Sequence, residues 1–308
     1  MQATKIKVIG VGGSGCNAIT RMKKCNLRGV ELVAVNSDAQ DLEEAKADTK
    51  IRIGRELTQG LGTGMDPSVG RDAALEQKEE LEEAVEDADL VFVTCGQGGG
   101  TGTGASPVIA KAAKENGALT VAVVTKPFSF EGAQRKKTAT KGLKKLKKQV
   151  DTLVVIPNDK ITELSDEELE LDEAFWMADE VLRQAVSGIS ELIVGSGIVN
   201  VDFADIKTIM EDSGRALFGM GKAEGELRAK KAVEDALNSP FLGWSIEGAE
   251  GALFSVSGQN IALTEIDKIA STLSDKLSSD ARLIFGAIED NDLKKKELKV
   301  TLIATGFE

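Results

Sequence analysis

The chain has 308 residues, of which 42% are hydrophobic and 29% charged, and this length and composition predict a folded protein of two domains. Its formal net charge of -12 argues against nucleic acid as a partner, its lack of histidine excludes a histidine-dependent catalytic triad, and the spacing of its three cysteines predicts neither a disulfide framework nor a zinc site. No apolar run reaches the length of a membrane span and no signal-sequence pattern follows Met1, so we expect a cytoplasmic protein without direct membrane insertion.

The first predicted element is a short strand at residues 5–10. It runs into Gly10-Val11-Gly12-Gly13-Ser14-Gly15 and then into a helix from Asn17 to Met22. This is GxGxxG between a strand and a helix, the context in which backbone N–H groups bind a pyrophosphate. A second strand, at residues 31–35, is followed by Asp38, which in a Rossmann enzyme would bind a ribose hydroxyl. A dinucleotide-binding Rossmann fold is therefore one candidate.

Two further glycine-rich loops follow predicted strands. A strand at residues 51–53 leads to Gly60-Leu61-Gly62-Thr63-Gly64-Met65-Asp66-Pro67 and an acidic helix predicted over residues 68–87. A strand at residues 89–95 leads to Gly96-Gln97-Gly98-Gly99-Gly100-Thr101-Gly102-Thr103-Gly104 and a helix predicted over residues 105–114. Six glycines in nine residues exceed what a tight turn needs, and a flexible linker would not be flanked so closely by a buried strand and a helix. We interpret this last loop as an anion cradle built from backbone N–H groups at a helix N-terminus.

The number of such loops bears on the ligand. A nicotinamide enzyme needs one pyrophosphate loop, whereas this chain has three, which fits three phosphates better than two. No GxxxxGKS or GxxxxGKT motif is present, so the P-loop route to a triphosphate is excluded and the cradle relies on backbone amides. Further strands predicted at residues 119–125 and 152–156 complete a parallel sheet whose carboxyl-end loops would bind the ligand. Between them, the basic stretch 135–148 is interpreted as a solvated helix face.

The pattern Gly-Gly-Gly-Thr-Gly-Thr-Gly at residues 98–104 resembles the signature of the tubulin/FtsZ family of GTPases. The similarity extends through every nucleotide loop to Ala304-Thr305-Gly306-Phe307. The resemblance implies an α/β fold in which a parallel-sheet, Rossmann-like GTPase domain (1–171) is joined by a central helix and catalytic loop region (172–218) to a smaller α+β domain (219–308). It implies GTP or GDP as the bound nucleotide, and Mg²⁺ is expected to bridge the β- and γ-phosphates.

The same resemblance implies roles for individual residues. Those expected at the phosphates are Gly12, Gly13, Ser14, Gly62, Gly64, Gly96, Gly98, Gly99, Gly100, Thr101, Gly102, Thr103, Gly104 and Arg135. Those expected elsewhere on the nucleotide are Asn17, Pro127, Glu131, Asn158, Phe175 and Asp179. Among these, Glu131 matches the ribose-binding glutamate, and Asn17, Asn158, Phe175 and Asp179 match guanine contacts. Departures from the family pattern occur at Ser14, Cys16, Met65 and the pair Ala133-Gln134.

A long helix is predicted from Asp172 to Gly195, with an apolar stripe that includes Phe175. Spacing alone favours a core position for Phe175. However, Phe175 and Asp179 are four residues apart on one face, where a ring and a carboxylate would stack on a purine and accept its N–H protons. The resemblance implies this second arrangement.

The helix is followed by a candidate catalytic loop. Taken alone, Asn200 or Asp202 reads as a helix N-cap and Asp205 as a favourable first-turn charge. Yet a cradle without histidine needs groups that orient water, and a helix of about twenty residues spans about 30 Å, too far for these residues to reach their own nucleotide. The resemblance implies that Asn-x-Asp-x-x-Asp completes the GTPase site of the next subunit in a head-to-tail homopolymer.

In the remainder we expect helices at residues 225–237 and 264–277, strands at residues 251–257, 281–288 and 298–304, and no separate active site. The resemblance implies a role at the mid-cell division ring. It also implies that accessory division proteins bind through a flexible tail, which members of the family usually carry beyond the position of Glu308.

Three hypotheses remain: a self-assembling GTPase, a Rossmann-type NAD enzyme, and a nucleotide-binding relative that does not hydrolyse GTP. The first accounts for the three loops, the missing P-loop lysine and the displaced aspartates.

Overall fold

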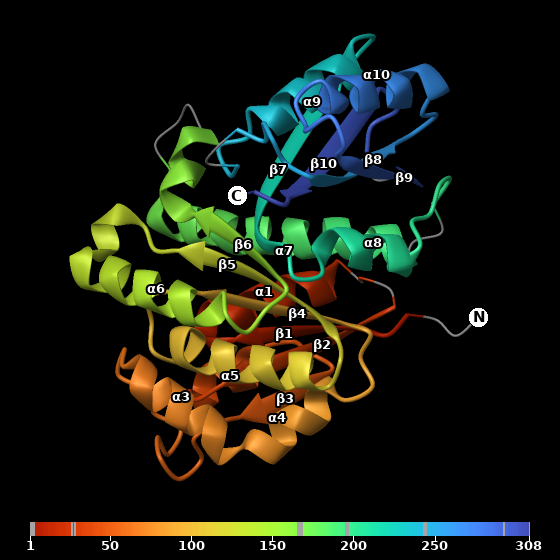
Figure 1. Cartoon of the computed structure of the whole chain (residues 1–308). Helices are drawn as coiled ribbons and strands as arrows, with labels where there is room; N and C mark the ends of the chain where they lie inside the picture. The colour runs from red at the N-terminus through yellow and green to blue at the C-terminus, as the bar shows by residue number, and fades with distance from the viewer. Residues whose placement is uncertain are drawn as a thin grey trace. The chain divides into compact units, whose positions relative to one another are not determined.

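The computed structural model describes residues 4–25, 27, 29–164, 169–194, 197–242, 245–291 and 293–307. The chain divides into two compact units, residues 1–187 and 188–308 (Figure 1). The division falls within the long helix α7 (Leu171–Val194). Among the described residues, no helix is long and apolar enough to cross a membrane.

The first unit is built on six parallel strands in the order β3-β2-β1-β4-β5-β6. Their bounds are β1 (Ile6–Val11), β2 (Val30–Asn36), β3 (Thr49–Arg52), β4 (Leu90–Gly96), β5 (Leu119–Lys126) and β6 (Thr152–Pro157). The central strands are almost continuously buried, as expected for a parallel sheet covered on both faces. The order of strands reverses between β1 and β4, and this switch point opens a crevice at their carboxyl ends.

Helices cover both faces of this sheet (Figure 1). One face packs against α3 (Pro67–Glu76), α4 (Lys78–Val85), α5 (Thr101–Glu115) and α6 (Ala133–Leu146). The other packs against α1 (Gly12–Lys24) and α2 (Ala39–Glu44), with Cys16, Ala34 and Leu42 in a smaller apolar cluster. Two 3-10 helices, η1 (Ser129–Glu131) and η2 (Asn158–Leu164), follow β5 and β6.

The second unit has a mixed sheet in the order β7-β10-β8-β9, in which β10 is antiparallel to β7 and β8, and β8 is parallel to β9. The strands are β7 (Gly214–Glu224), β8 (Gly251–Gly258), β9 (Arg282–Glu289) and β10 (Glu297–Thr305). Helices α9 (Arg228–Leu237) and α10 (Leu263–Ser274) contribute to its apolar core, and α8 (Phe203–Met210) precedes β7. These observations confirm the predicted α/β class.

Several elements differ from the sequence prediction. The acidic helix expected over residues 68–87 is two helices that meet at Gln77, whose side chain accepts a hydrogen bond from the Gly54 N–H. Strand β7 was not predicted because glycines interrupt its apolar pattern. These glycines let α9 lie close to the strand: a Cβ on Gly221 would lie 2.1 Å from the Ala232 carbonyl oxygen, and one on Gly219 would lie 2.4 Å from that of Ala236.

Helices α3 and α5 also meet at glycines, and this contact yields a prediction. A Cβ on Gly104 would lie 2.1 Å from the Pro67 carbonyl oxygen, whereas one on Gly99 would meet no protein atom within 4 Å. We expect Gly104→Ala to lower the free energy of unfolding by about 1–3 kcal/mol through overpacking. Gly99→Ala is the matched control and should unfold like the wild type. Urea unfolding of the nucleotide-free proteins measures both, and an unchanged Gly104→Ala midpoint would contradict this account of the contact.

Candidate functional site

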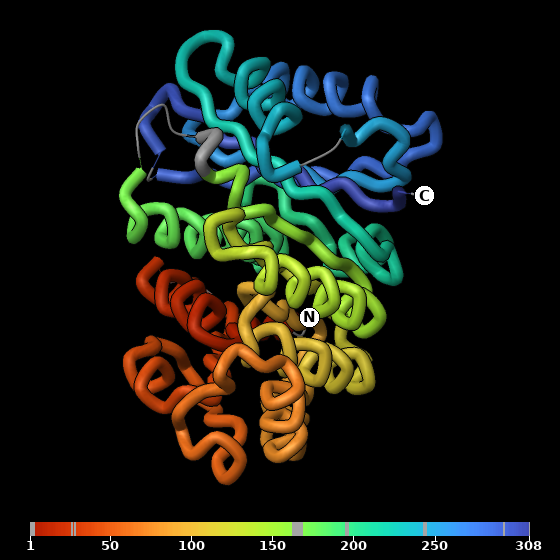
Figure 2. Tube along the Cα trace, turned by 90° about the vertical axis from the view of Figure 1, so that its left-hand side faces the viewer, coloured from red at the N-terminus to blue at the C-terminus, as the bar shows by residue number. Residues whose placement is uncertain are grey.

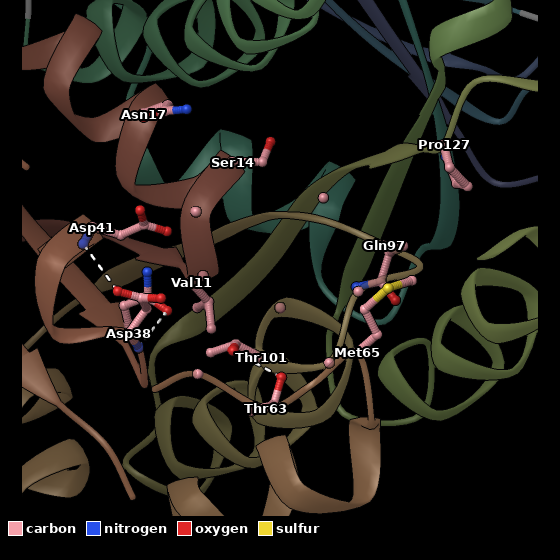
Figure 3. Close-up of a pocket in the computed structure, with 18 of the residues that line it drawn as sticks. Val11, Ser14, Asn17, Asp38, Asp41, Thr63, Met65, Gln97, Thr101 and Pro127 are labelled. Carbon is pink, nitrogen blue, oxygen red and sulfur yellow. Dashed lines mark hydrogen bonds between the residues drawn. The ribbon is translucent and has the colours of Figure 1, made fainter. Parts of the chain in front are cut away.

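A cavity of about 640 Å³ lies in the first unit, at the carboxyl ends of its parallel strands (Figure 3). Residues at or next to the carboxyl ends of five strands line it: Val11, Asn36, Gly96, Thr125 and Asn158. The cavity therefore occupies the crevice that the strand order opens, where open α/β sheets bind their ligands.

The cavity contains most of the residues predicted for the first unit. These are Gly12, Gly13, Ser14, Asn17, Gly62, Gly64, Gly96, Gly99, Gly100, Thr101, Gly102, Pro127, Glu131, Arg135, Asn158, Phe175 and Asp179. Gly98, Thr103 and Gly104 are not among its lining residues. The Gly98 N–H donates to the Thr103 hydroxyl at 2.8 Å, so this pair shapes the loop from within.

Asp38, considered from the sequence only as a ribose ligand of a Rossmann enzyme, also lines the cavity. Other lining residues were not predicted as site residues: Val11, Asn36, Asp41, Leu61, Thr63, Met65, Gln97, Thr125 and Ala178. Figure 3 shows Asp38 and Asp41 on one side of the cavity and Gln97 and Pro127 across from them. Most of these residues directly adjoin predicted ones in the loops. Asp41 had no such signal, because it lies in α2, a helix of six residues that is too short for its periodicity to be read.

The floor of the cavity is formed where the N-termini of α1 and α5 meet. Gly12 has a φ of +72°, and a Cβ there would lie 3.0 Å from the Gly102 backbone nitrogen. Neither helix has an acidic residue in its first turn. The N–H groups of a first helical turn have no partner within the helix, and the helix dipole favours an anion at this end. The two helix ends together form a site for an anion with several oxygen atoms.

The charged side chains at the cavity are mostly acidic. Its described lining residues include four carboxylates, those of Asp38, Asp41, Glu131 and Asp179, and one cation, Arg135. Arg135 pairs with Glu131, which also accepts a hydrogen bond from the Phe128 N–H at 2.8 Å. Burial, followed by the nearby charge of Asp38, raises the pKa of Asp41. An anion bound here would therefore be held chiefly by backbone N–H groups.

Asp179 is a buried carboxylate on α7 that faces α1. It accepts a hydrogen bond from the Ser14 hydroxyl at 3.1 Å and lies 3.7 Å from the guanidinium of Arg21. That guanidinium also lies over the ring of Trp176, 5.0 Å from its centre. Burial raises the pKa of Asp179 to about 6, although Arg21 and Ser14 favour the charged form. Ligand N–H donors would offset part of this desolvation.

Phe175 and Asn158 supply further contacts for a flat, polar ligand. Phe175 is 40% exposed, so the core position that spacing alone favoured is wrong. Its ring packs edge-on against Phe128 and Phe130, with centroids 5.5 and 6.2 Å away. The Asn158 side-chain oxygen is buried and accepts no hydrogen bond from any described residue. A buried acceptor without a partner favours a ligand that supplies a hydrogen-bond donor.

Asn200, Asp202 and Asp205 belong to the second unit. Asn200 accepts a hydrogen bond from the Gly197 N–H at 2.8 Å. Asp202 is the N-cap of α8 and accepts from the Ala204 N–H at 3.1 Å, while Asp205 is exposed in the first turn of that helix. The capping role considered from the sequence is thus present. It leaves the Asp205 carboxylate at the surface.

Comparison with known proteins identifies both units. Residues 5–166 match the tubulin/FtsZ family GTPase domain, and residues 214–308 match the C-terminal domain of the FtsZ family. The chain is 50% identical over 302 residues to cell division protein FtsZ 1 of Thermococcus kodakarensis, covering 98% of this chain and 80% of that protein.

Solved structures also match nearly the whole chain. An empty FtsZ dimer from M. jannaschii matches with a TM-score of 0.96 and 49% identity, covering 99% of this chain and 89% of that one. A GTPγS-bound protofilament of CetZ2 from Haloferax volcanii matches with a TM-score of 0.82 and 22% identity, covering 99% and 94%. The latter likeness concerns the fold alone.

The environment of Asp179 predicts a pH dependence of stability. Its pKa rises from 3.8 to about 6 in the fold, so between these pH values the folded state binds more protons than the unfolded state. The free energy of unfolding should therefore fall as pH rises through this window and level off above it. Between about pH 5 and about pH 7, the nucleotide-free wild type should lose about 1 kcal/mol relative to Asp179→Asn. Urea unfolding at a series of pH values tests this, and parallel curves for the two proteins would refute it.

Proposed function

The chain belongs to the tubulin/FtsZ family of GTPases, and from this membership we propose that it assembles head to tail into filaments that act in cell division, each GTPase site being completed by the neighbouring subunit. The observation that carries the proposal is the cavity floor, where two helix N-termini meet backbone to backbone beneath a loop that contains Gly62 and Gly64. This arrangement suits a triphosphate without a P-loop lysine.

We place the nucleotide in the cavity by the chemistry of its walls. The phosphates lie at the N-termini of α1 and α5, and the base lies toward Phe175 and Asp179 on α7. Guanine presents two N–H donors where adenine presents an acceptor, so the Asp179 carboxylate favours guanine. The Asn158 oxygen is a second acceptor for the base, and Glu131 is placed at the ribose.

A Mg²⁺ ion fits this site as a partner of the phosphates. Among the described residues, no group of three or more Asp, Glu, Cys or His side chains is arranged to hold a metal. Mg²⁺ commonly binds through one or two carboxylates together with substrate phosphates and water. We assign Asp38 and Asp41 as the nearby carboxylates, and the ion would neutralise charge that develops on the phosphates.

The catalytic carboxylates are proposed to come from Asp202 and Asp205 of a second copy, with Asn200 beside them. Asp179 of α7 lines the cavity, and the helix continues for 15 residues beyond it to Val194, which is about 22 Å at 1.5 Å per residue, before the chain reaches this loop. Asp205 is exposed, so a neighbour's nucleotide has access to it. In this arrangement Asp205 orients and activates the attacking water, and Asp202 holds the first turn of α8 in place.

Such an assembly is open-ended, because a contact between two different surfaces repeats from copy to copy. The relatives compared above include an FtsZ dimer at 49% identity, which supports self-association. We place the filament at the mid-cell division ring, together with accessory division proteins, on the strength of the 50% identical cell division protein.

Gly99 provides a clean test of the phosphate cradle. It lines the cavity, and a Cβ there would meet no protein atom within 4 Å. We expect Gly99→Ala to keep wild-type stability and to bind GTP at least about tenfold more weakly, because the methyl group hinders close approach of phosphate to the backbone. Equilibrium binding of a fluorescent GTP analogue measures this.

Gly100 and Gly102 are poorer choices for the same test. A Cβ on Gly100 would lie 2.0 Å from the Thr63 hydroxyl, and one on Gly102 would lie 2.8 Å from the Gly96 carbonyl oxygen, so either change disturbs the fold as well. Unaltered GTP affinity in Gly99→Ala would place the phosphates elsewhere.

The shared site predicts that turnover depends on assembly. GTPase activity per subunit should rise from almost nothing with protein concentration and level off as filaments form. Asp205→Ala should bind GTP and assemble normally, yet hydrolyse it at least about 100-fold more slowly. Turnover and light scattering, measured together across a concentration series, provide the readout.

Mixing two variants supplies the control. Gly99→Ala subunits retain the carboxylates, and Asp205→Ala subunits retain the nucleotide. At a GTP concentration that loads only the latter, the mixture should therefore turn over faster than either alone. Turnover per subunit that is independent of concentration, with no polymer present, would rule out the shared site and point to Asp38 or Asp41 of the same subunit.

A further inference from the structure

A second hollow, a groove of about 820 Å³, lies among the helices of the first unit and shares no described lining residue with the nucleotide cavity. Helix α5 forms its floor, α3 and α4 form one wall, and α6 forms the other. Figure 2 shows α5 (yellow) between α6 (yellow-green) and the α3–α4 pair (orange). The floor residues run from Thr103 to Glu115, which is about 18 Å at 1.5 Å per residue. The groove is therefore long enough for about three turns of a bound helix.

The base of the groove is apolar, because α5 turns small and apolar residues toward it. Gly104, Pro107, Val108 and Ala112 follow one another at helical spacing and all line the groove. Leu75 of α3 adds a large apolar side chain that is 49% exposed. Apolar side chains gathered in a surface hollow favour a partner that covers them.

The lining of the groove is strongly basic, although the whole chain has a net charge of -12. Its described residues include seven cations and two carboxylates. Both carboxylates are already paired, Glu82 with Lys78 at 3.1 Å and Glu115 with Lys111 at 3.5 Å. Arg71 is engaged in the same way by the aspartate next to it, at 2.7 Å. Four cations of the lining are left, and all four belong to the α6 wall.

These four cations, Lys141, Lys144, Lys145 and Lys148, form a lysine row. They occupy positions i, i+3, i+4 and i+7, so they share one face at the C-terminal end of α6. All are exposed, and their side chains make no hydrogen bond or ion pair with any described residue. Residues 133–148 contain no Asp or Glu that could offset their mutual repulsion. An acidic partner would relieve that repulsion.

The apolar base and the lysine row together select among possible occupants. A nucleic acid would engage the lysines but leave the apolar base uncovered, and the described lining has no aromatic side chain on which a base could stack. A flat anionic bilayer would reach the lysines at the rim but not the base between the helices. An amphipathic helix with acidic residues beside its apolar stripe matches both features, since such helices bind grooves through apolar residues at i, i+3, i+4 and i+7.

We propose that the groove formed by α3, α4, α5 and α6 is a docking site for an acidic amphipathic helix of a partner protein. The apolar stripe of that helix lies on Pro107, Val108 and Leu75, and its carboxylates face the lysine row. An adjoining hollow lined by Glu83 and Glu86 keeps the acidic side of the partner against α6. The site lies outside the nucleotide cavity and does not rest on the proposed function.

A designed peptide serves as the probe for this site. It has about 15 residues, with leucines at helical spacing on one face, glutamates on one side of them and glutamines on the other. One comparison peptide has the same composition in an order that places leucines on all faces, and another has alanine in place of every leucine. Fluorescence anisotropy of the labelled peptides measures binding to the GDP form of the protein, so that GTP-driven assembly does not contribute.

Three variants of the protein isolate the groove. Lys141→Glu with Lys145→Glu reverses two members of the lysine row. Lys137→Glu with Lys147→Glu is the matched control, because it reverses two exposed lysines of the same stretch that do not line the groove and changes the net charge equally. Leu75→Gln removes the exposed apolar side chain and leaves the charge unchanged. Urea unfolding and GTP turnover establish that each variant is folded and that its nucleotide site is intact.

The expected results follow from the two features of the groove. Wild type should bind the designed peptide at about 50 mM salt, and at least about tenfold more weakly at about 500 mM salt. The lysine-row variant should bind it at least about tenfold more weakly than wild type, and Leu75→Gln at least about threefold more weakly. The matched control should bind it as wild type does. Both comparison peptides should bind wild type at least about tenfold more weakly than the designed peptide.

Other outcomes would overturn the proposal. Absence of peptide binding at low salt would leave the groove without this occupant, and equally tight binding of the alanine peptide would reveal a site for polyanions in general. An equal loss in the matched control would assign the attraction to the basic stretch as a whole. Sedimentation of wild type with phosphatidylglycerol vesicles, or GDP-form dimers, would assign the groove to a membrane or to a second copy if either was lost in the lysine-row variant.

Discussion

The close approach of two helix N-termini at Gly12 and Gly102 is the constraint on which the first unit depends. Each helix closely follows a central strand, α1 directly after β1 and α5 after β4 across the short loop 97–100, and these two strands are neighbours in the sheet. Strand pairing therefore fixes where the helices begin. A side chain at either glycine would separate the two ends and the N–H groups they present.

An anion site built from backbone N–H groups leaves the side chains of the cavity free for other tasks. A lysine-based cradle would bring fixed positive charge, whereas four carboxylates line this cavity around a site suited to an anion. Each carboxylate acts locally instead. Asp179 accepts a hydrogen bond from Ser14, and Asp38 is the N-cap of α2. Glu131 pairs with Arg135 and accepts a hydrogen bond from the Phe128 N–H. The family membership shows a GTPase domain, and the roles of these side chains at the sugar and the base are part of our proposal.

The sequence predicted those parts that local pattern determines. Apolar runs located most of the strands, and the three glycine loops located the cavity, because parallel strands end at one edge. The sequence did not predict strand β7, because its glycines serve packing against α9. It did not predict the break at Gln77 either, because Gly54, which donates to the Gln77 side chain, is distant in the sequence. Phe175 shows the limit most clearly: the same apolar stripe suits a core residue or a ligand contact, and only the 40% exposure of Phe175 in the fold rules out the core position.

The way the cavity carboxylates are engaged also bears on catalysis. A group that activates water needs a free oxygen and a pKa near the working pH. Asp179 has a suitable pKa, about 6, but it is committed to Ser14 and Arg21 at the end of the cavity assigned to the base. Asp38 accepts two backbone N–H groups, and Glu131 is paired with Arg135. Asp41 is the remaining carboxylate among the cavity's described lining residues, and we assign it to the Mg²⁺ ion beside the phosphates. In the shared-site arrangement that we propose, hydrolysis depends on assembly, because the exposed Asp205 of a neighbour supplies the carboxylate that the cavity of a single copy lacks. The same proposal couples the lifetime of the filament to GTP hydrolysis, because the phosphate bond that is broken would belong to the nucleotide enclosed by the contact between subunits.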